Sequence, residues 1–267
     1  IKSPQLLMLS GIGPADQLEQ FGIPVIQDLP GVGQNLMNHL SAQVTFKVKD
    51  GLTLFGDVDG VHFGLHYTSD GSSEVNDMLM RTTPMVDERP ERVPGLRTKF
   101  LNDEVPADRV ARISITLGLP DGSGYVNLAS DDPSVQPTFN YRYLQDPNDK
   151  RRVREGIRKA ADFLETGAYK DVCDRRLHPT DDILGNDDAL DLYIAQTVGT
   201  ARHVSGTCKM GPDSDPMAVV DQYCQVKGVT GLSVVDASVK PKITRSGGSH
   251  ATVLMMAERA VEFVAPA

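Results

Sequence analysis

Residues 110–118 read Val110-Ala-Arg-Ile-Ser-Ile-Thr-Leu-Gly118, with apolar and polar side chains in alternation. Alternation with a period of two, in a stretch rich in β-branched residues, predicts a strand with one buried face. The turn sequence Asp121-Gly-Ser-Gly124 follows, and Tyr125-Val-Asn-Leu128 indicates a second strand. We therefore expect 110–128 to form a hairpin within an antiparallel sheet.

Helical patterns flank this β-rich region. Apolar residues recur at three- and four-residue spacing from Asp146 to about Thr166, and two more helices are expected over 187–198 and 249–264. We expect the basic run Lys150-Arg151-Arg152 to lie on an exposed helix face. The other predicted elements are a helix over 14–21, strands over 25–26 and 41–48, short strands and loops over 50–108, and a buried parallel strand over 232–236.

The order of these elements predicts a mixed α/β protein in which α/β segments at both ends enclose an antiparallel β region and a helix. Two discontinuous domains would give this pattern, because the terminal segments can return to one domain while the middle builds the other. We expect 1–40 and 196–267 to form the first domain and 41–195 to form the second.

Composition excludes several classes of protein. The 267 residues are 40% hydrophobic and 24% charged, which is typical of a globular chain and not of a disordered or fibrous one. The net charge of −9 disfavours binding to a phosphate backbone, so no nucleic-acid partner is expected. No apolar run approaches the ~20 residues that span a bilayer, so no membrane span is expected.

The three cysteines, Cys173, Cys208 and Cys224, match neither a CxxC pair nor a disulfide framework. This favours a reducing compartment such as the cytoplasm. The chain opens Ile1-Lys-Ser-Pro-Gln-Leu-Leu7, without an initiator Met or a signal peptide. We therefore expect the chain to be a piece of a longer protein, and its localisation stays open because a targeting segment would lie upstream.

Two of the six histidines stand beside small residues. His203 precedes Val-Ser-Gly-Thr207, and His250 follows Gly247-Gly-Ser249 at the predicted start of the last helix. A histidine that faces a cavity can move protons near neutral pH, whereas the simpler interpretation is a histidine satisfied by backbone partners. Neither has the spacing of a zinc ligand, and no metal is expected.

Other signatures are weak or absent. The pairs Gly11-Ile-Gly13 and Gly31-Val-Gly33 fall short of the GxGxxG that binds dinucleotides, and no Walker motif or Gly-x-Ser-x-Gly elbow occurs. Cys208 is followed by Lys209 and could be a thiol of low pKa, although a buried structural thiol is the favoured interpretation.

Both ends of the chain resemble one known family. The segments Ser3-Pro-Gln-Leu-Leu-Met-Leu-Ser-Gly-Ile-Gly13 and Gly31-Val-Gly-Gln-Asn-Leu-Met-Asn-His39 are similar to a family signature and the stretch after it. The C-terminal match is His203-x₂-Gly-Thr-Cys-x-Met-Gly211, then Gly228-Val-x-Gly-Leu-x-Val-Val-Asp-Ala-Ser238, then the helix at His250. These motifs resemble the glucose–methanol–choline (GMC) family of FAD oxidoreductases.

The resemblance implies an FAD-binding, doubly wound domain that includes both ends of this chain. It also implies a substrate domain in the middle, with an antiparallel sheet and flanking helices. Members of the family carry GxGxxG in an N-terminal half of similar size. The resemblance therefore implies FAD as cofactor, a small-molecule alcohol as substrate, and a separate N-terminal chain of the same protein as partner.

Residue by residue, the resemblance places His203 at the family's catalytic histidine and His250 at a second catalytic position. His203 would take the hydroxyl proton of an alcohol while a hydride passes to flavin N5, because an alkoxide donates hydride better than an alcohol. Asp236 and Ala237 would contact the FAD phosphate and ribityl region. His250, Ala251 and Thr252 would place the helix start at the flavin ring, although many members have Asn-Pro or Asn-Ala-Pro there.

Three hypotheses follow. The first is an FAD-dependent alcohol oxidase or dehydrogenase that uses His203 as base. The second is a non-redox lyase or cyclase that keeps the flavin in a structural role. The third is a non-catalytic fragment that requires its partner chain. The sequence does not identify the alcohol, the electron acceptor or the oligomeric state.

Overall fold

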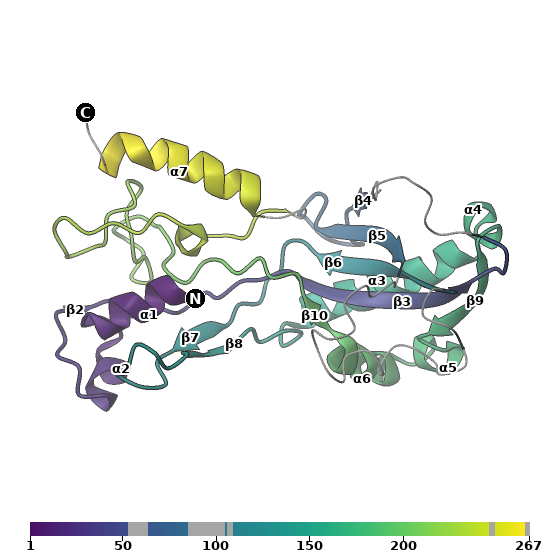
Figure 1. Cartoon of the computed structure of the whole chain (residues 1–267), viewed down its shortest axis with the longest axis horizontal. Helices are drawn as coiled ribbons and strands as arrows, with labels where there is room; N and C mark the ends of the chain where they lie inside the picture. The colour runs from purple at the N-terminus through teal and green to yellow at the C-terminus, as the bar shows by residue number, and fades with distance from the viewer. Residues whose placement is uncertain (53–63, 85–104, 106–108, 246–248, 265–267) are drawn as a thin grey trace. The chain divides into compact units, whose positions relative to one another are not determined.

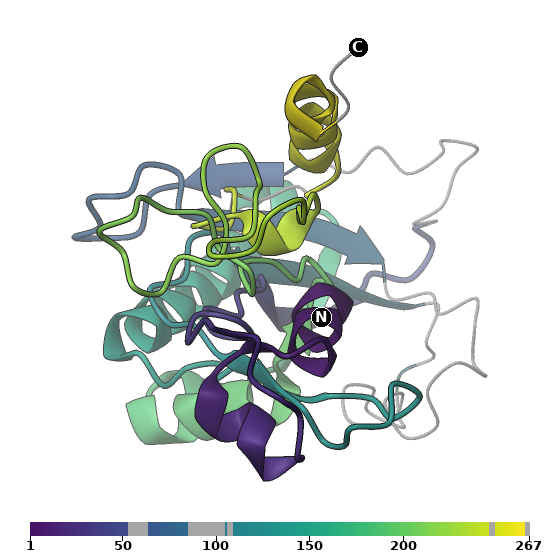
Figure 2. The same ribbon diagram turned by 90° about the vertical axis from the view of Figure 1, so that its left-hand side faces the viewer.

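The computed structural model describes residues 1–52, 64–84, 105, 109–245 and 249–264 (Figures 1 and 2). The chain divides into two compact units, each built from separate segments. Unit 1 comprises Ile1–His39, Pro120–Asp146 and Ala201–Ala267, and unit 2 comprises Leu40–Leu119 and Pro147–Thr200. The predicted middle domain, 41–195, differs in that residues 120–146 belong with the chain ends. Among the described helices, none has the length and apolarity needed to cross a bilayer.

A six-stranded antiparallel sheet is the centre of unit 2. Its strands run in the order β10-β3-β6-β5-β4, and β9 also pairs with β3. β3 uses one edge for β6 and shares the other between β10 at its start and β9 at its end. The bounds are β3 Leu40–Val48, β4 Gly64–Tyr67, β5 Met78–Pro84, β6 Val110–Leu117, β9 Cys173–His178 and β10 Gly199–Thr200.

Helix α3 (Pro147–Leu164) packs on this sheet, in contact with β3, β5, β6 and β9 (Figure 1). At Gly156 a Cβ atom would lie 2.6 Å from Cγ2 of Ile115, so the close approach of helix and sheet requires glycine. The described residues of unit 2 also form three shorter helices: α4 (Gly167–Lys170), α5 (Asp181–Leu184) and α6 (Asp187–Thr197). Tyr193 of α6 donates a hydrogen bond of 2.9 Å to the carbonyl of Gln43 in β3.

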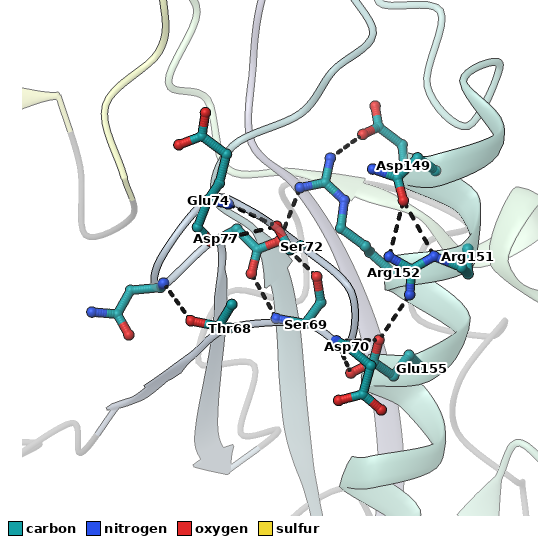
Figure 3. Close-up of polar contacts among 12 residues, drawn as sticks. Thr68, Ser69, Asp70, Ser72, Glu74, Asp77, Asp149, Arg151, Arg152 and Glu155 are labelled. Carbon is teal, nitrogen blue, oxygen red and sulfur yellow. Dashed lines mark hydrogen bonds and ion pairs between the residues drawn. The ribbon is translucent and has the colours of Figure 1, made fainter.

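A buried cation holds α3 to the loop between β4 and β5 (Figure 3). Arg152 of α3 is 1% exposed and bonds Asp77 at 3.0 Å and Asp149 at 2.6 Å. Asp77 also accepts hydrogen bonds from the amide and the hydroxyl of Ser69, at 2.8 and 2.6 Å. The prediction of an exposed basic face is therefore wrong for Arg152, because two carboxylates, one near in sequence and one distant, compensate its charge in the interior.

Unit 1 is built from short elements around one apolar core. They are α1 Lys2–Leu9, β1 Ile12–Gly13, α2 Ala15–Gln20, β2 Gln27–Asp28, β7 Tyr125–Asn127, β8 Thr138–Asn140, the 3₁₀ turn η3 Ala237–Val239 and α7 His250–Val264, most of which Figure 1 labels. β1 pairs with β2 in parallel and β7 with β8 in antiparallel fashion. The core joins Leu7 and Met8 of α1 to Leu18, Val219 and Val239.

Several expected elements are confirmed within one or two residues at most ends. They are the helices over 14–21, 146–166, 187–198 and 249–264 and the strands over 41–48 and 110–118. The fold class, mixed α/β with an antiparallel sheet and flanking helices, is also confirmed.

Three predicted β features are wrong. Residues 110–117 and 125–127 form no hairpin, because β3 and β5 occupy both edges of β6 while β7 pairs with β8. The strand expected at 25–26 forms two residues later, at Gln27–Asp28. Residues 232–236 are not a strand: their one pairing among the described residues is the isolated bridge Gln225↔Ser233, and a parallel strand needs a continuous neighbour.

Candidate active site

His203 lies in the segment that re-enters unit 1 after β10, and its main chain is fixed by a neighbouring asparagine. The amide N–H of His203 donates to Oδ1 of Asn38 at 2.8 Å. Nδ2 of Asn38 donates to the hydroxyl of Tyr143, also at 2.8 Å, and the Tyr143 ring stacks on Tyr141 with centroids 4.9 Å apart. Asn38 is 3% exposed, so this support for the His203 backbone is buried.

A second histidine contacts the ring of His203. Nδ1 of His39 lies 2.9 Å from Nδ1 of His203, and the two rings meet edge to face at 84°. The other ring nitrogen of His39, Nε2, lies 2.9 Å from the carbonyl oxygen of Thr244. His39 is fully buried, at 0% exposure, whereas His203 is half-buried.

The segment after His203 is bonded to the 3₁₀ turn η3. The amide of Gly206 donates to the carbonyl of Ala237 at 3.1 Å, and the amide of Cys208 donates to that of Ser238 at 2.8 Å. Cys208 is fully buried, and this burial raises the pKa of its thiol to about 12. Cys208 is therefore a structural thiol, and its interpretation as a reactive one is excluded.

Asp236 caps η3 and does not project into open space. Its Oδ1 accepts from the amide of Ser238 at 2.6 Å, and its Oδ2 accepts a short bond from the hydroxyl of Ser3. Burial opposes ionisation of Asp236, but the hydrogen bonds from Ser238 and Ser3 outweigh it and hold the pKa of the carboxyl below its usual value. The carboxylate thus orders the turn that presents Ala237.

A buried lysine ties η3 to the first turn of α7. Lys240 is 3% exposed, and its Nζ donates to Oγ1 of Thr252 at 2.6 Å. Thr252 in turn donates to the carbonyl of Ser249 at 2.9 Å. Burial lowers the pKa of Lys240. His250 and Ala251 stand accessible to solvent at the start of the helix.

The structure therefore links most of the predicted site residues through unit 1. Asp236 and Ala237 are joined to the His203 segment by Gly206 and to Thr252 by Lys240. His250 begins the same helix as Thr252, but the residues just before it, 246–248, lie outside the described part of the chain. The catalytic role of His250 stays a prediction.

The start of α7 fits the electron-rich group for which it was predicted. The first turn of a helix offers amide N–H groups without intrahelical acceptors, and in α7 this turn is solvent-accessible at His250 and Ala251. The adjacent hydroxyl of Ser249 is buried and has no hydrogen-bond partner in the part of the chain that the structure describes. Polar groups in this state are commonly satisfied by a ligand or water.

Unit 2 holds an apolar hollow of about 640 Å³ that is chemically different from this site. It is lined mainly by apolar side chains from β4, β5, β6 and the end of α3, among them Leu65, Met80, Ile113 and Phe163. The one titratable group among its described lining residues is the hydroxyl of Tyr169, which is bonded to Thr82. The described lining of this hollow therefore offers no histidine or carboxylate for acid–base chemistry.

Asn38 and His39 belong to the site, although the sequence alone did not indicate them. Both lie in the stretch Gly31–His39 that carried the family resemblance, but 165 and 164 residues separate them from their bonds with His203. The signal was the polar pair Asn38-His39 directly before a buried strand, which sequence spacing could not connect to His203.

Comparison with known proteins identifies the family. A family model described as GMC oxidoreductase matches residues 120–257, more than half of the chain. The chain belongs to the GMC oxidoreductase family. It is 34% identical to the oxygen-dependent choline dehydrogenase of Photobacterium profundum, over 99% of this chain and 48% of that protein.

Two further relatives agree on the family and on the extent of the match. The GMC chain is 32% identical to the oxygen-dependent choline dehydrogenase of Vibrio vulnificus, over 99% of this chain and 49% of the relative. Its fold superposes on a crystal structure of pyridoxine 4-oxidase from Mesorbium loti with a TM-score of 0.83 and 27% identity, covering 98% of this chain and 49% of that one. The chain thus spans about half the length of these relatives.

Proposed function

We propose that this GMC chain forms part of an FAD-dependent enzyme that oxidises an alcohol, with His203 as the base. The observation that carries the proposal is the double support of His203, at its main chain by Asn38 and at its ring by His39. A histidine held in this way can accept a proton at one defined atom. Choline and pyridoxine, named for two relatives, both carry hydroxyl groups, which supports an alcohol as substrate.

The residues at the start of α7 would hold the flavin. The amides of His250 and Ala251 and the Ser249 hydroxyl would donate to its pyrimidine ring, which gains negative charge on reduction, and the ordered turn at Asp236 would present the amide of Ala237. When bound, FAD supplies the acceptor for the hydride that leaves the alcohol carbon. His250 would hydrogen-bond the substrate oxygen.

His203 performs the proton step of this reaction. The alcohol loses its hydroxyl proton to the imidazole and a hydride from its carbon, and a carbonyl compound remains. Removing the proton raises the electron density on oxygen, which makes the carbon a better hydride donor. The buried pair of Asn38 and His39 keeps the imidazole in position while it gains the proton.

We further propose that a polypeptide outside these 267 residues completes the site, either as a separate chain or as the rest of a longer one. Helix α7 supports this, because it leaves large apolar side chains exposed: Leu254 at 56%, Met255 at 63% and Val261 at 57%. Such an exposed apolar face is typical of a surface that packs against another segment.

The test replaces His203 with Ala in the full-length protein. We expect the variant to keep its flavin, seen in the visible absorption spectrum. Anaerobic flavin reduction by a panel of alcohols that includes choline and pyridoxine should slow by about 10²–10⁴-fold, the usual contribution of an acid–base group.

Lys209→Ala is the matched control, because Lys209 lies six residues further on and pairs with Asp215 near the surface at 2.8 Å. It should reduce at the parent rate. Unchanged reduction in the His203 variant would overturn the assignment of the base. A parent flavin that no alcohol bleaches would favour the non-redox hypothesis instead.

A further inference from the structure

We propose that His39 is a positioning residue that keeps the proton of neutral His203 on Nδ1, so that Nε2 is the atom that accepts the substrate proton. The inference deepens the proposed function and rests on it for the role of His203, while the tautomer itself is a property of the protein without substrate.

The carbonyl of Thr244 fixes the tautomer of His39. A carbonyl oxygen only accepts hydrogen bonds, so the 2.9 Å contact requires a hydrogen on Nε2 of His39. In a neutral imidazole one nitrogen carries a hydrogen and the other accepts. Nδ1 of neutral His39 is therefore an acceptor.

The tautomer of His39 then determines the tautomer of His203. Nδ1 of His39 and Nδ1 of His203 are 2.9 Å apart, which is the length of a hydrogen bond and holds one hydrogen. Because Nδ1 of His39 accepts, Nδ1 of His203 donates. Neutral His203 is thus protonated on Nδ1, and its lone pair is on Nε2. The same bond survives when His203 gains a proton, since Nδ1 still donates.

Burial makes this assignment energetically important. His39 is 0% exposed, and its carbonyl accepts from the amide of Ala201 at 3.0 Å, so the residue is held by its backbone and by both ring nitrogens. A buried acceptor left without a donor carries a cost in free energy. The Nε2–H tautomer of His203, the more populated form of free histidine, would leave Nδ1 of His39 facing a second lone pair.

Two amide substitutions separate the two contacts of His39. The amide of Asn reaches about as far as Nδ1 of histidine, and that of Gln about as far as Nε2. His39→Asn therefore keeps an acceptor for His203 and gives up the Thr244 bond. His39→Gln keeps the Thr244 bond and gives up the acceptor. His39→Phe keeps the ring shape and gives up both.

In the full-length holoenzyme, we expect His39→Gln and His39→Phe to slow flavin reduction by about 10–100-fold, by analogy with the loss of a partner that orients a metal-bound imidazole. Flavin content and KM should stay near the parent values. His39→Asn should reduce close to the parent rate. The reverse order, with Gln rescuing and Asn failing, would show that His39 only anchors Thr244 and would overturn the proposal.

The tautomer is read directly by two-bond ¹H–¹⁵N NMR of the full-length protein labelled with [¹⁵N]histidine, without substrate and at a pH where His203 is neutral. The His203 signals are assigned by their loss in His203→Ala. We expect the Nδ1–H pattern in the parent protein and Nε2–H in His39→Gln. Nε2–H in the parent would overturn the proposal even if every variant failed to fold. Normal flavin reduction in His203→Ala would instead refute the proposed base and leave the tautomer result standing.

Discussion

Gly206 shows how tightly the segment after His203 is constrained at the level of a single residue. Its φ is +91°, in the region that only glycine adopts readily, and a Cβ atom there would lie 2.4 Å from the carbonyl oxygen of Asn35. Gly206 also donates to the carbonyl of Ala237. Gly206 therefore lets the His203 segment pack closely against the backbone of Asn35 while its amide bonds η3.

Gly206→Ala should lower the free energy of unfolding by more than the cost of placing alanine at a positive φ, because the added Cβ atom would also meet the backbone of Asn35. The matched control is Gly231→Ala, because Gly231 has a φ of +78° and no atom within 4 Å of its Cβ position. The control should lower the free energy of unfolding by about 1–2 kcal/mol, the cost of a left-handed residue. Denaturant unfolding should show a larger loss for Gly206→Ala than for the control. Equal losses would mean that the backbone of Asn35 moves to accommodate the added Cβ atom.

The residue that could be predicted at this scale is His203, whose neighbours form a recognisable motif. Its partners could not be predicted, since a contact across 164 positions leaves no periodic signal. Asp236 was predicted as a residue near the cofactor, but its bonds with Ser3 and Ser238 show that it also orders the chain. A carboxylate's partners depend on tertiary packing, which spacing does not encode.

At the scale of elements, α3 depends on a buried group of charged residues within an otherwise apolar contact. Val153, Ile157 and Leu164 are buried at the spacing that the sequence predicts, and Arg152 lies beside them with Asp77 and Asp149 (Figure 3). Charge alone suggested a solvated face for Arg152, because sequence does not show that the β4–β5 loop brings a carboxylate to it. The false hairpin at 110–128 has a similar origin: adjacent strands need not pair when other strands fill their edges.

Replacing Arg152 with Ala should lower the free energy of unfolding by about 3–5 kcal/mol, because it leaves two carboxylates in the interior without a counterion. Arg151→Ala is the matched control one position away: its side chain is 40% exposed and pairs with Glu155 at 3.2 Å. The control should change stability by about 0–1 kcal/mol. Denaturant unfolding of both variants measures the difference, and similar losses would contradict a buried ion pair at Arg152.

For the whole molecule, stability should follow individual buried groups and not net charge. The pKa of Asp77, despite burial, is held below its usual value by hydrogen bonds from Ser69 and Arg152, and burial lowers the pKa of His178. A group with a lowered folded pKa stabilises the fold above its unfolded pKa, and this stabilisation is lost as the pH falls through the folded value. Both groups therefore favour the folded state at neutral pH.

We expect a shallow loss of stability as the pH falls below 6.5, the ordinary value for His178, and a steeper loss below 3.8, the ordinary value for Asp77 and Asp236. Thermal unfolding measured from pH 7 to about pH 2.5 gives this profile. The range must extend below the ordinary pKa of these carboxyls, because the loss of stability continues down to their lowered pKa values in the folded state. Asp77→Asn should flatten the acid limb. A maximum of stability near the isoelectric point of about 5.1, where repulsion between like charges is least, would contradict this account.

The division of unit 1 among three segments has a consequence for how the protein is made. Leu7 and Met8 belong to the same core as Val219 and Val239, yet residues 40–119 and 147–200 of the other unit come between these segments. At a synthesis rate of about 5–20 residues per second, Ala201 leaves the ribosome roughly 10–30 s after His39. For that time the apolar side of α1 can pack only against core residues that are already synthesised, such as Leu18 and later Leu128, so the core of unit 1 stays incomplete until the last segment emerges.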